Sequence, residues 1–65
     1  GLPTFDDIKA KLDTLTTIAA INDYAKTVGE LFPSPTDKQR YTIQTMFTIR
    51  REELTEARST YHANN

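Results

Sequence analysis

A helix-start signal at residues 34–37 is the feature that most constrains what this chain can fold into. Ser34 suits the N-cap, Pro35 the first helical position and Asp37 the third. Apolar residues then recur at spacings of three, four and seven, namely Ile43, Met46, Phe47, Leu54, Ala57 and Tyr61. This pattern predicts a helix over residues 35–60 with one apolar face.

The first part of the chain carries a second helical pattern. Thr4 is followed three residues later by Asp7, which is typical of a helix N-terminus. Apolar residues then fall on one narrow stripe, formed by Phe5, Ile8, Leu12 and Leu15. We therefore expect a helix over residues 5–15.

A third apolar face follows the threonine-rich residues 14–17. β-Branched residues disfavour helix, and Thr16 or Thr17 can cap a new one. At 100° per residue one face then collects Ile18, Ile21, Tyr24, Ala25, Val28, Leu31 and Phe32. Gly29 near the end is one candidate for the C-terminal cap, and Pro33 prevents continuation. The pattern predicts a helix from residue 17 to residue 28 or 32, and one kinked helix from residue 5 is the alternative.

Three amphipathic helices joined by short loops are typical of an all-α three-helix bundle with antiparallel neighbours. Because the chain has 65 residues and no cysteine, packing alone must stabilise it. The expected core contains Phe5, Ile8, Leu12, Ile21, Val28, Leu31, Ile43, Phe47 and Leu54. We interpret residues 1–65 as one domain. Since the chain starts without Met, we expect a module cut from a longer protein, with removal of an initiator Met as the alternative.

The charge and the hydropathy pattern argue against several classes of function. Eight Lys and Arg against nine Asp and Glu give a net charge of −1, so no global field selects nucleic acid or an anionic membrane. Apolar runs stay far below the ~20 residues that span a bilayer, and residues 1–5 do not resemble a signal peptide. These features predict a cytoplasmic protein without membrane contact.

Groups that could perform catalysis are scattered. His62 stands near the C-terminus, where we expect a frayed tail from residue 61, and no acid or nucleophile is arranged around it. The adjacent acidic pairs at residues 6–7 and 52–53 point about 100° apart on a helix. We therefore predict no catalytic residue, no metal site and no cofactor, and the chain does not read as an enzyme.

Two positions on the third helix suggest contact with a partner. Arg50 interrupts the apolar stripe between Phe47 and Leu54. It can lay its stem over the core and extend its guanidinium to solvent or to a carboxylate, or it can receive a carboxylate from a partner. Ile49 is apolar on the polar outer face, where it is either an ordinary single exposed apolar residue or a contact residue for a partner. Candidate partner-binding residues are Arg50, Arg51, Lys38 and Ile49, and the expected ligand is an acidic peptide with an apolar tip.

Direct contact with nucleic acid is a weaker interpretation. The third helix carries five cations, Lys38, Arg40, Arg50, Arg51 and Arg58, but four acids interleave with them, Asp37, Glu52, Glu53 and Glu56. A nucleic-acid-binding face carries a clear excess of positive charge. A protein partner is therefore favoured.

The order Ile18–Ile21–Tyr24–Val28–Leu31, the Pro/Ser/Thr-rich turn and the ending Phe47-x-x-Arg50-Arg51-x-Glu53-Leu54 resemble a small C-terminal helical domain of phage single-strand annealing proteins. The resemblance covers about residues 15–56, with Arg-Arg where Arg-Lys is usual. It implies an adaptor in phage recombination or replication that docks a single-strand-binding protein or a companion nuclease. A stand-alone regulator that binds protein or DNA, and an oligomerisation domain, are the alternatives.

Overall fold

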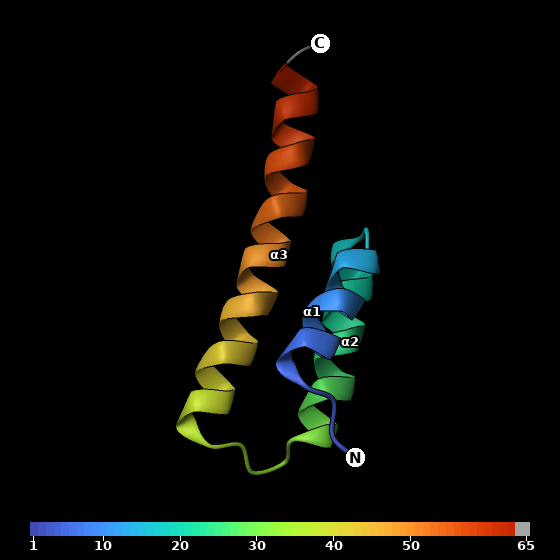
Figure 1. The fold of residues 1–65 in the computed structure, drawn as a ribbon. Coiled ribbons are helices and arrows are strands. Elements are labelled where there is room, and N and C mark those ends of the chain that lie inside the picture. The colour runs from blue at the N-terminus through green and yellow to red at the C-terminus, as the bar shows by residue number, and fades with distance from the viewer. Residues whose placement is uncertain (64–65) are drawn as a thin grey trace.

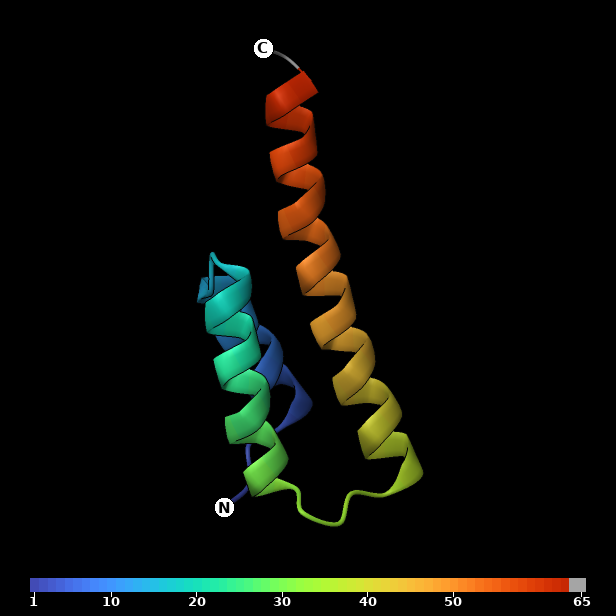
Figure 2. The same cartoon turned by 180° about the vertical axis from the view of Figure 1, so that it is seen from behind.

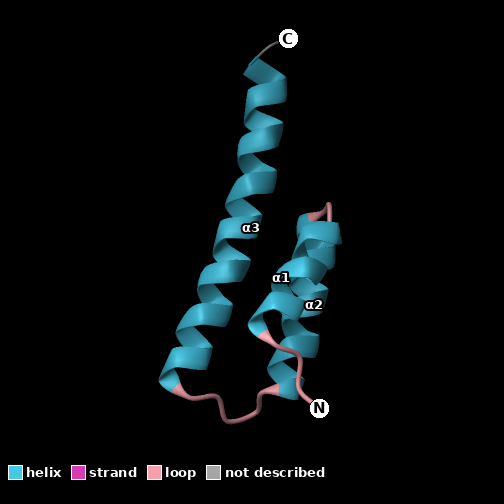
Figure 3. Cartoon of the chain, viewed as in Figure 1, coloured by secondary structure: helices cyan, strands magenta, loops and turns pink. Residues whose placement is uncertain are grey.

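The protein consists of three helices in a computed structural model that describes the backbone of residues 1–63 and the side chains of residues 1–57 (Figures 1 and 3). Helix α1 spans Phe5–Thr14, α2 spans Ile18–Leu31 and α3 spans Asp37–Ala63. Residues 1–63 contain no strand, so the all-α prediction is confirmed.

Helices α1 and α2 lie side by side against the first part of α3, and the C-terminal part of α3 extends beyond them (Figures 1 and 2). Successive helices run antiparallel, as short loops require. Each of the two shorter helices contacts α3 more extensively than it contacts the other. Helix α3 therefore provides the main packing surface for both shorter helices.

Threonine side chains start the first two helices. The main-chain N–H of Asp7 donates to Thr4 Oγ1 at 3.0 Å, and the N–H of Thr4 donates back to Asp7 Oδ2 at 2.9 Å. Thr17 Oγ1 accepts from the N–H of Ala20 at 3.1 Å. Because α2 has its own cap, α1 and α2 are separate helices, and the single kinked helix is ruled out.

The start of α3 corrects the prediction that Ser34 is the N-cap. Thr36 Oγ1 accepts from the N–H of Gln39 at 3.1 Å, and Gln39 Oε1 accepts from the N–H of Thr36 at 2.9 Å. This reciprocal pair is a capping box, which satisfies two of the N–H groups at the helix start. The helix consequently begins at Asp37 rather than at Pro35.

Two helix ends also differ from the prediction. The C-cap of α2 is Phe32, whose N–H donates to Val28 O at 3.0 Å, so Gly29 lies inside the helix and is not its cap. Helix α3 continues to Ala63, three residues past the predicted end. The predicted inward position of Tyr61 and the predicted exposure of His62 fall on side chains outside the described residues.

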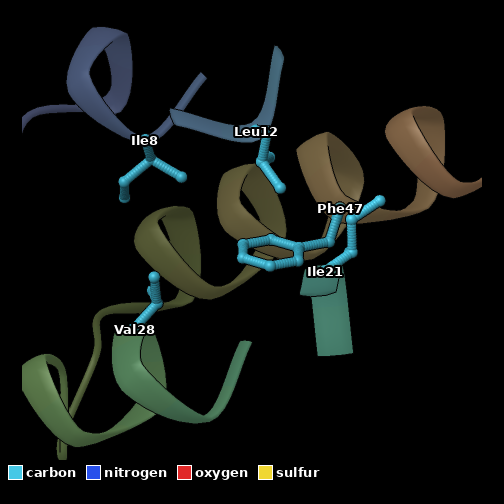
Figure 4. Packing of buried hydrophobic residues seen from close by; sticks show 5 residues of the cluster. All are labelled: Ile8, Leu12, Ile21, Val28 and Phe47. Atoms are coloured by element: carbon cyan, nitrogen blue, oxygen red, sulfur yellow. The ribbon is translucent and has the colours of Figure 1, made fainter. Parts of the chain in front are cut away.

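The core lies where α1 and α2 meet α3. Its buried residues are Ile8 and Leu12 from α1, Ile21 and Val28 from α2, and Phe47 from α3 (Figure 4). Partly buried side chains pack against them, including Leu15, Tyr24, Phe32, Ile43, Met46 and Leu54. Phe5 is half-buried.

Leu31 does not belong to this core. Its side chain is 42% exposed, in contrast to the prediction. The reason is its place in the last turn of α2, about 60° around the helix from Val28. Phe32, the next residue, packs against the core instead.

Candidate protein-interaction groove

A groove of about 460 Å³ opens between α2 and α3. Its lining residues are Ala25, Val28, Gly29, Phe32, Pro35, Arg40, Ile43, Gln44, Phe47, Thr48 and Arg51. Apolar side chains from both helices predominate, and two arginines are the charged members. No acidic side chain is among the lining residues of this groove. The groove therefore combines an apolar surface with a local positive charge.

Arg51 is held in a fixed position beside the groove. Its Nε and one Nη donate to Asn22 Oδ1 at 3.1 and 3.0 Å, which links α3 to α2. Its Cζ lies 5.7 Å from the centroid of the Phe47 ring, a cation–π geometry. Two of the five guanidinium N–H groups are used by Asn22, so three remain for other acceptors.

The Phe47 ring connects this arginine to the core. It stacks on Tyr24 with a centroid separation of 5.7 Å and an interplanar angle of 28°. Burial raises the pKa of the Tyr24 hydroxyl above its ordinary value, and the negative charge of Asp7 adds to the effect. Neutral Tyr24 is thus the form that suits this packing.

Arg40 supplies the second positive charge of the groove. Its side chain is 56% exposed, and its guanidinium lies 3.7 Å from Asp37. Arg40 and Arg51 are eleven residues apart on α3, which corresponds to about 16 Å along the axis and about 20° around it. Both arginines therefore lie on the same face of the helix, one toward each end of the groove.

Arg50, a predicted partner-binding residue, lies on the α1 side of α3. Its Nε donates to Leu12 O at 3.0 Å and one Nη donates to Leu15 O at 3.0 Å. The other Nη pairs with Glu53 at 3.3 Å. The side chain is only 18% exposed. Its main acceptors are carbonyl oxygens at the end of α1, which the sequence interpretation did not include.

The other predicted residues do not lie in one place. Ile49 is 51% exposed and lines a shallow outer depression of α3 together with Tyr41, which is 73% exposed. Lys38 is exposed in the first turn of α3 and does not line the groove. Of the four predicted partner-binding residues, Arg51 alone is a lining residue of the α2–α3 groove.

Sequence reasoning missed Arg40, Gly29 and Phe32 as groove residues. A signal for the α3 side was present, because Arg40, Gln44, Phe47 and Arg51 recur at spacings of four, three and four. The sequence interpretation treated Arg40 only as one of five cations along the third helix and did not connect it with Phe47. The contribution of α2 depends on how the two helices pack, which periodicity alone does not determine.

Within the described part of the chain, no group of three His, Cys, Asp or Glu residues could hold a metal ion. None of the helices, as far as they are described, has the length and apolar character to cross a membrane. No protein-family model, curated protein or solved structure matches this chain.

Proposed function

We propose that this protein is a non-catalytic interaction module that binds a segment of a partner protein in the α2–α3 groove. The observation that carries the proposal is the groove itself, an apolar surface of about 460 Å³ flanked by Arg40 and Arg51. Pockets that bind partners commonly combine an apolar lining with a few oriented polar groups. Arginine is also among the residues enriched at protein interfaces.

The resemblance of residues 15–56 to phage single-strand annealing proteins supports phage DNA recombination or replication as the biological setting of this module. In that setting the module belongs to a phage recombination or replication protein and acts in the cytoplasm of the bacterial host. Its partner is a single-strand-binding protein or a companion nuclease. The acidic tail of a single-strand-binding protein has the charge that Arg40 and Arg51 attract.

Calorimetric titration with the purified host single-strand-binding protein, and separately with the companion nuclease, tests the proposal. Gly29→Met is the diagnostic variant, because a Cβ at this position would meet no atom within 4 Å and the longer side chain would extend into the groove. Methionine is also a better helix former than glycine, so the variant should stay folded. We expect binding by the wild type and a loss of about tenfold or more in the variant.

Ile49→Ser is the matched control, since it changes an exposed apolar residue on the outer face of α3. Its affinity should equal that of the wild type. If neither partner binds at about 0.1 mM, both proposed partners are rejected. If Gly29→Met binds as well as the wild type, the groove is not the docking site.

Oligomerisation is the second candidate function, and exposed Tyr41 and Ile49 on the outer face of α3 favour it. Contiguous apolar patches mark contact sites, and Tyr41 and Ile49 line the same outer depression of α3. Sedimentation over a concentration series would detect self-association, and Ile49→Ser should then abolish it. The same variant leaves the groove intact, so the two functions can be separated.

A further inference from the structure

We infer that the groove binds an extended acidic segment whose two carboxylates lie four residues apart, on either side of one apolar side chain. This inference rests on the proposed function and specifies the chemistry of the partner. The occupant is defined by charge complementarity, because the lining residues of the groove include two arginines and no acid.

The separation of the arginines sets the separation of the carboxylates. Arg40 and Arg51 lie about 16 Å apart along one face of α3. In an extended chain, residues i and i+4 point to the same side and lie about 13 Å apart. The flexible stem of exposed Arg40 can cover the remaining ~3 Å. Two carboxylates that lie four residues apart can therefore reach both arginines from the same side of an extended segment.

The length of chain needed favours an extended segment over a helix. A helix would need about eleven residues to place two carboxylates 16 Å apart on one face. An extended chain needs about five residues to place two carboxylates about 13 Å apart on one side, so fewer residues lose conformational freedom on binding. The groove can receive the alternate side chains of such a short strand, while the rest of the segment faces solvent.

The groove surface between Arg40 and Arg51 determines which kind of side chain is favoured at the centre of the bound segment. The apolar side chains of Val28, Ile43 and Phe47 line this part, with the polar side chains of Gln44 and Thr48 beside them. Gly29 leaves open space where another residue would place a Cβ. Residue i+2 of an extended segment points to the same side as the two acids. An aliphatic or aromatic side chain at i+2 would therefore be buried against this surface.

Arg51 is the better oriented of the two anion receptors. Asn22 and the Phe47 ring hold its guanidinium, so a carboxylate meets a donor that has already lost most of its rotational freedom. Arg40 is exposed and has a single weak ion pair with Asp37. We therefore expect Arg51 to contribute more to affinity than Arg40, and Asn22 to act as a positioning residue.

Fluorescence anisotropy with three labelled peptides of equal composition tests this inference. The first places Glu at i and i+4 with Leu at i+2, the second places both Glu residues together at one end, and the third spaces them eleven residues apart in a helix-forming sequence. We expect the first peptide to bind about tenfold more tightly than the other two. Arg51→Gln should weaken it most, Arg40→Gln less, and Asn22→Ala should reduce affinity with Arg51 still present.

Lys38→Gln is the matched control, because it removes a cation from the same helix outside the groove. It should leave the affinity for the first peptide unchanged. Equal affinity for the first two peptides would overturn the spacing, and tightest binding of the third would overturn the extended conformation. Failure of all three peptides, while the intact partner protein still binds the wild type and not Gly29→Met, would reject the acidic segment and leave the proposed function standing.

Discussion

The guanidinium Nε of Arg50 donates a hydrogen bond of 3.0 Å to the main-chain oxygen of Leu12. The last carbonyl groups of a helix have no partner within the helix, and the helix dipole makes this end negative. Arg50 also donates to Leu15 O, so a side chain of α3 caps the C-terminus of α1. This contact joins residues 38 positions apart in the sequence.

We expect Arg50→Ala to lower the free energy of unfolding by about 2–3 kcal/mol, because hydrogen bonds from a charged donor contribute about 1.5–3 kcal/mol. Arg50→Lys should recover only part of the loss, since an ammonium group cannot reproduce the guanidinium geometry. Urea denaturation followed by circular dichroism measures both effects.

Arg40→Ala is the control, since Arg40 is an exposed cation on the same helix. Its stability should change by less than about 0.5 kcal/mol. An Arg50→Ala protein with unchanged stability and weakened partner binding would instead return Arg50 to the partner-binding role that the sequence suggested.

The different contacts of Arg50 and Arg51 illustrate which features of the structure could be predicted from the sequence and which could not. Helical periodicity predicted three helices and placed Arg50 within an apolar stripe. Adjacent residues on a helix point about 100° apart. Whether Arg50 meets α1 and Arg51 meets α2 depends on which side of α3 each helix occupies. That arrangement follows from packing among all three helices, which the pattern of a single helix does not contain.

The start of α3 is a different case, because the sequence did contain the deciding signal. Thr36 and Gln39 match the S/T-x-x-E/Q pattern of a capping box. Ser34 and Pro35 also suit a helix start, and this competing signal led to the wrong residue. The reciprocal hydrogen bonds of Thr36 and Gln39 fix the cap two residues later.

Thr36→Ala should destabilise the protein by about 0.5–2 kcal/mol, because it leaves the N–H of Gln39 without its side-chain acceptor. Ser34→Ala should stay within about 0.5 kcal/mol of the wild type. Thermal unfolding of the two single variants gives the comparison. A larger loss for Ser34→Ala than for Thr36→Ala would contradict the observed cap.

Phe47→Ala should cost about 3–5 kcal/mol, because Phe47 is 4% exposed and lies among the buried residues of α1 and α2. A loss of this size is comparable to the total stability of a small domain. We therefore expect a largely unfolded variant by circular dichroism at 25 °C. Ile49→Ala, on the exposed face of the same helix, is the control and should remain folded.

Gly29→Ala should stabilise the protein by about 0.5–1 kcal/mol. Gly29 lies inside α2, and an alanine Cβ would meet no atom within 4 Å. Alanine has the higher helix propensity and loses less conformational entropy on folding. Chemical denaturation measures the gain, and a destabilised Gly29→Ala variant would show that this part of α2 departs from regular helix.

Tyr24 should make the stability of the protein fall at alkaline pH. Burial, together with the charge of Asp7, raises the pKa of its hydroxyl in the folded state. Between the unfolded-state pKa of about 10 and the raised folded-state pKa, the folded protein keeps a proton that the unfolded chain has lost. The stabilising contribution is therefore complete below about pH 10 and is lost as the pH rises through the folded-state pKa.

The free energy of unfolding, measured in urea from about pH 8 to 11, should decline less in Tyr24→Phe than in the wild type, since phenylalanine keeps the stacking on Phe47 without a titrating group. Below about pH 9 the two curves should run parallel, because the hydroxyl is neutral in both states of the protein. Tyr41→Phe, at an exposed position, is the matched control. Parallel curves for the wild type and Tyr24→Phe over the whole range would show that Tyr24 ionises equally in the folded and unfolded chains.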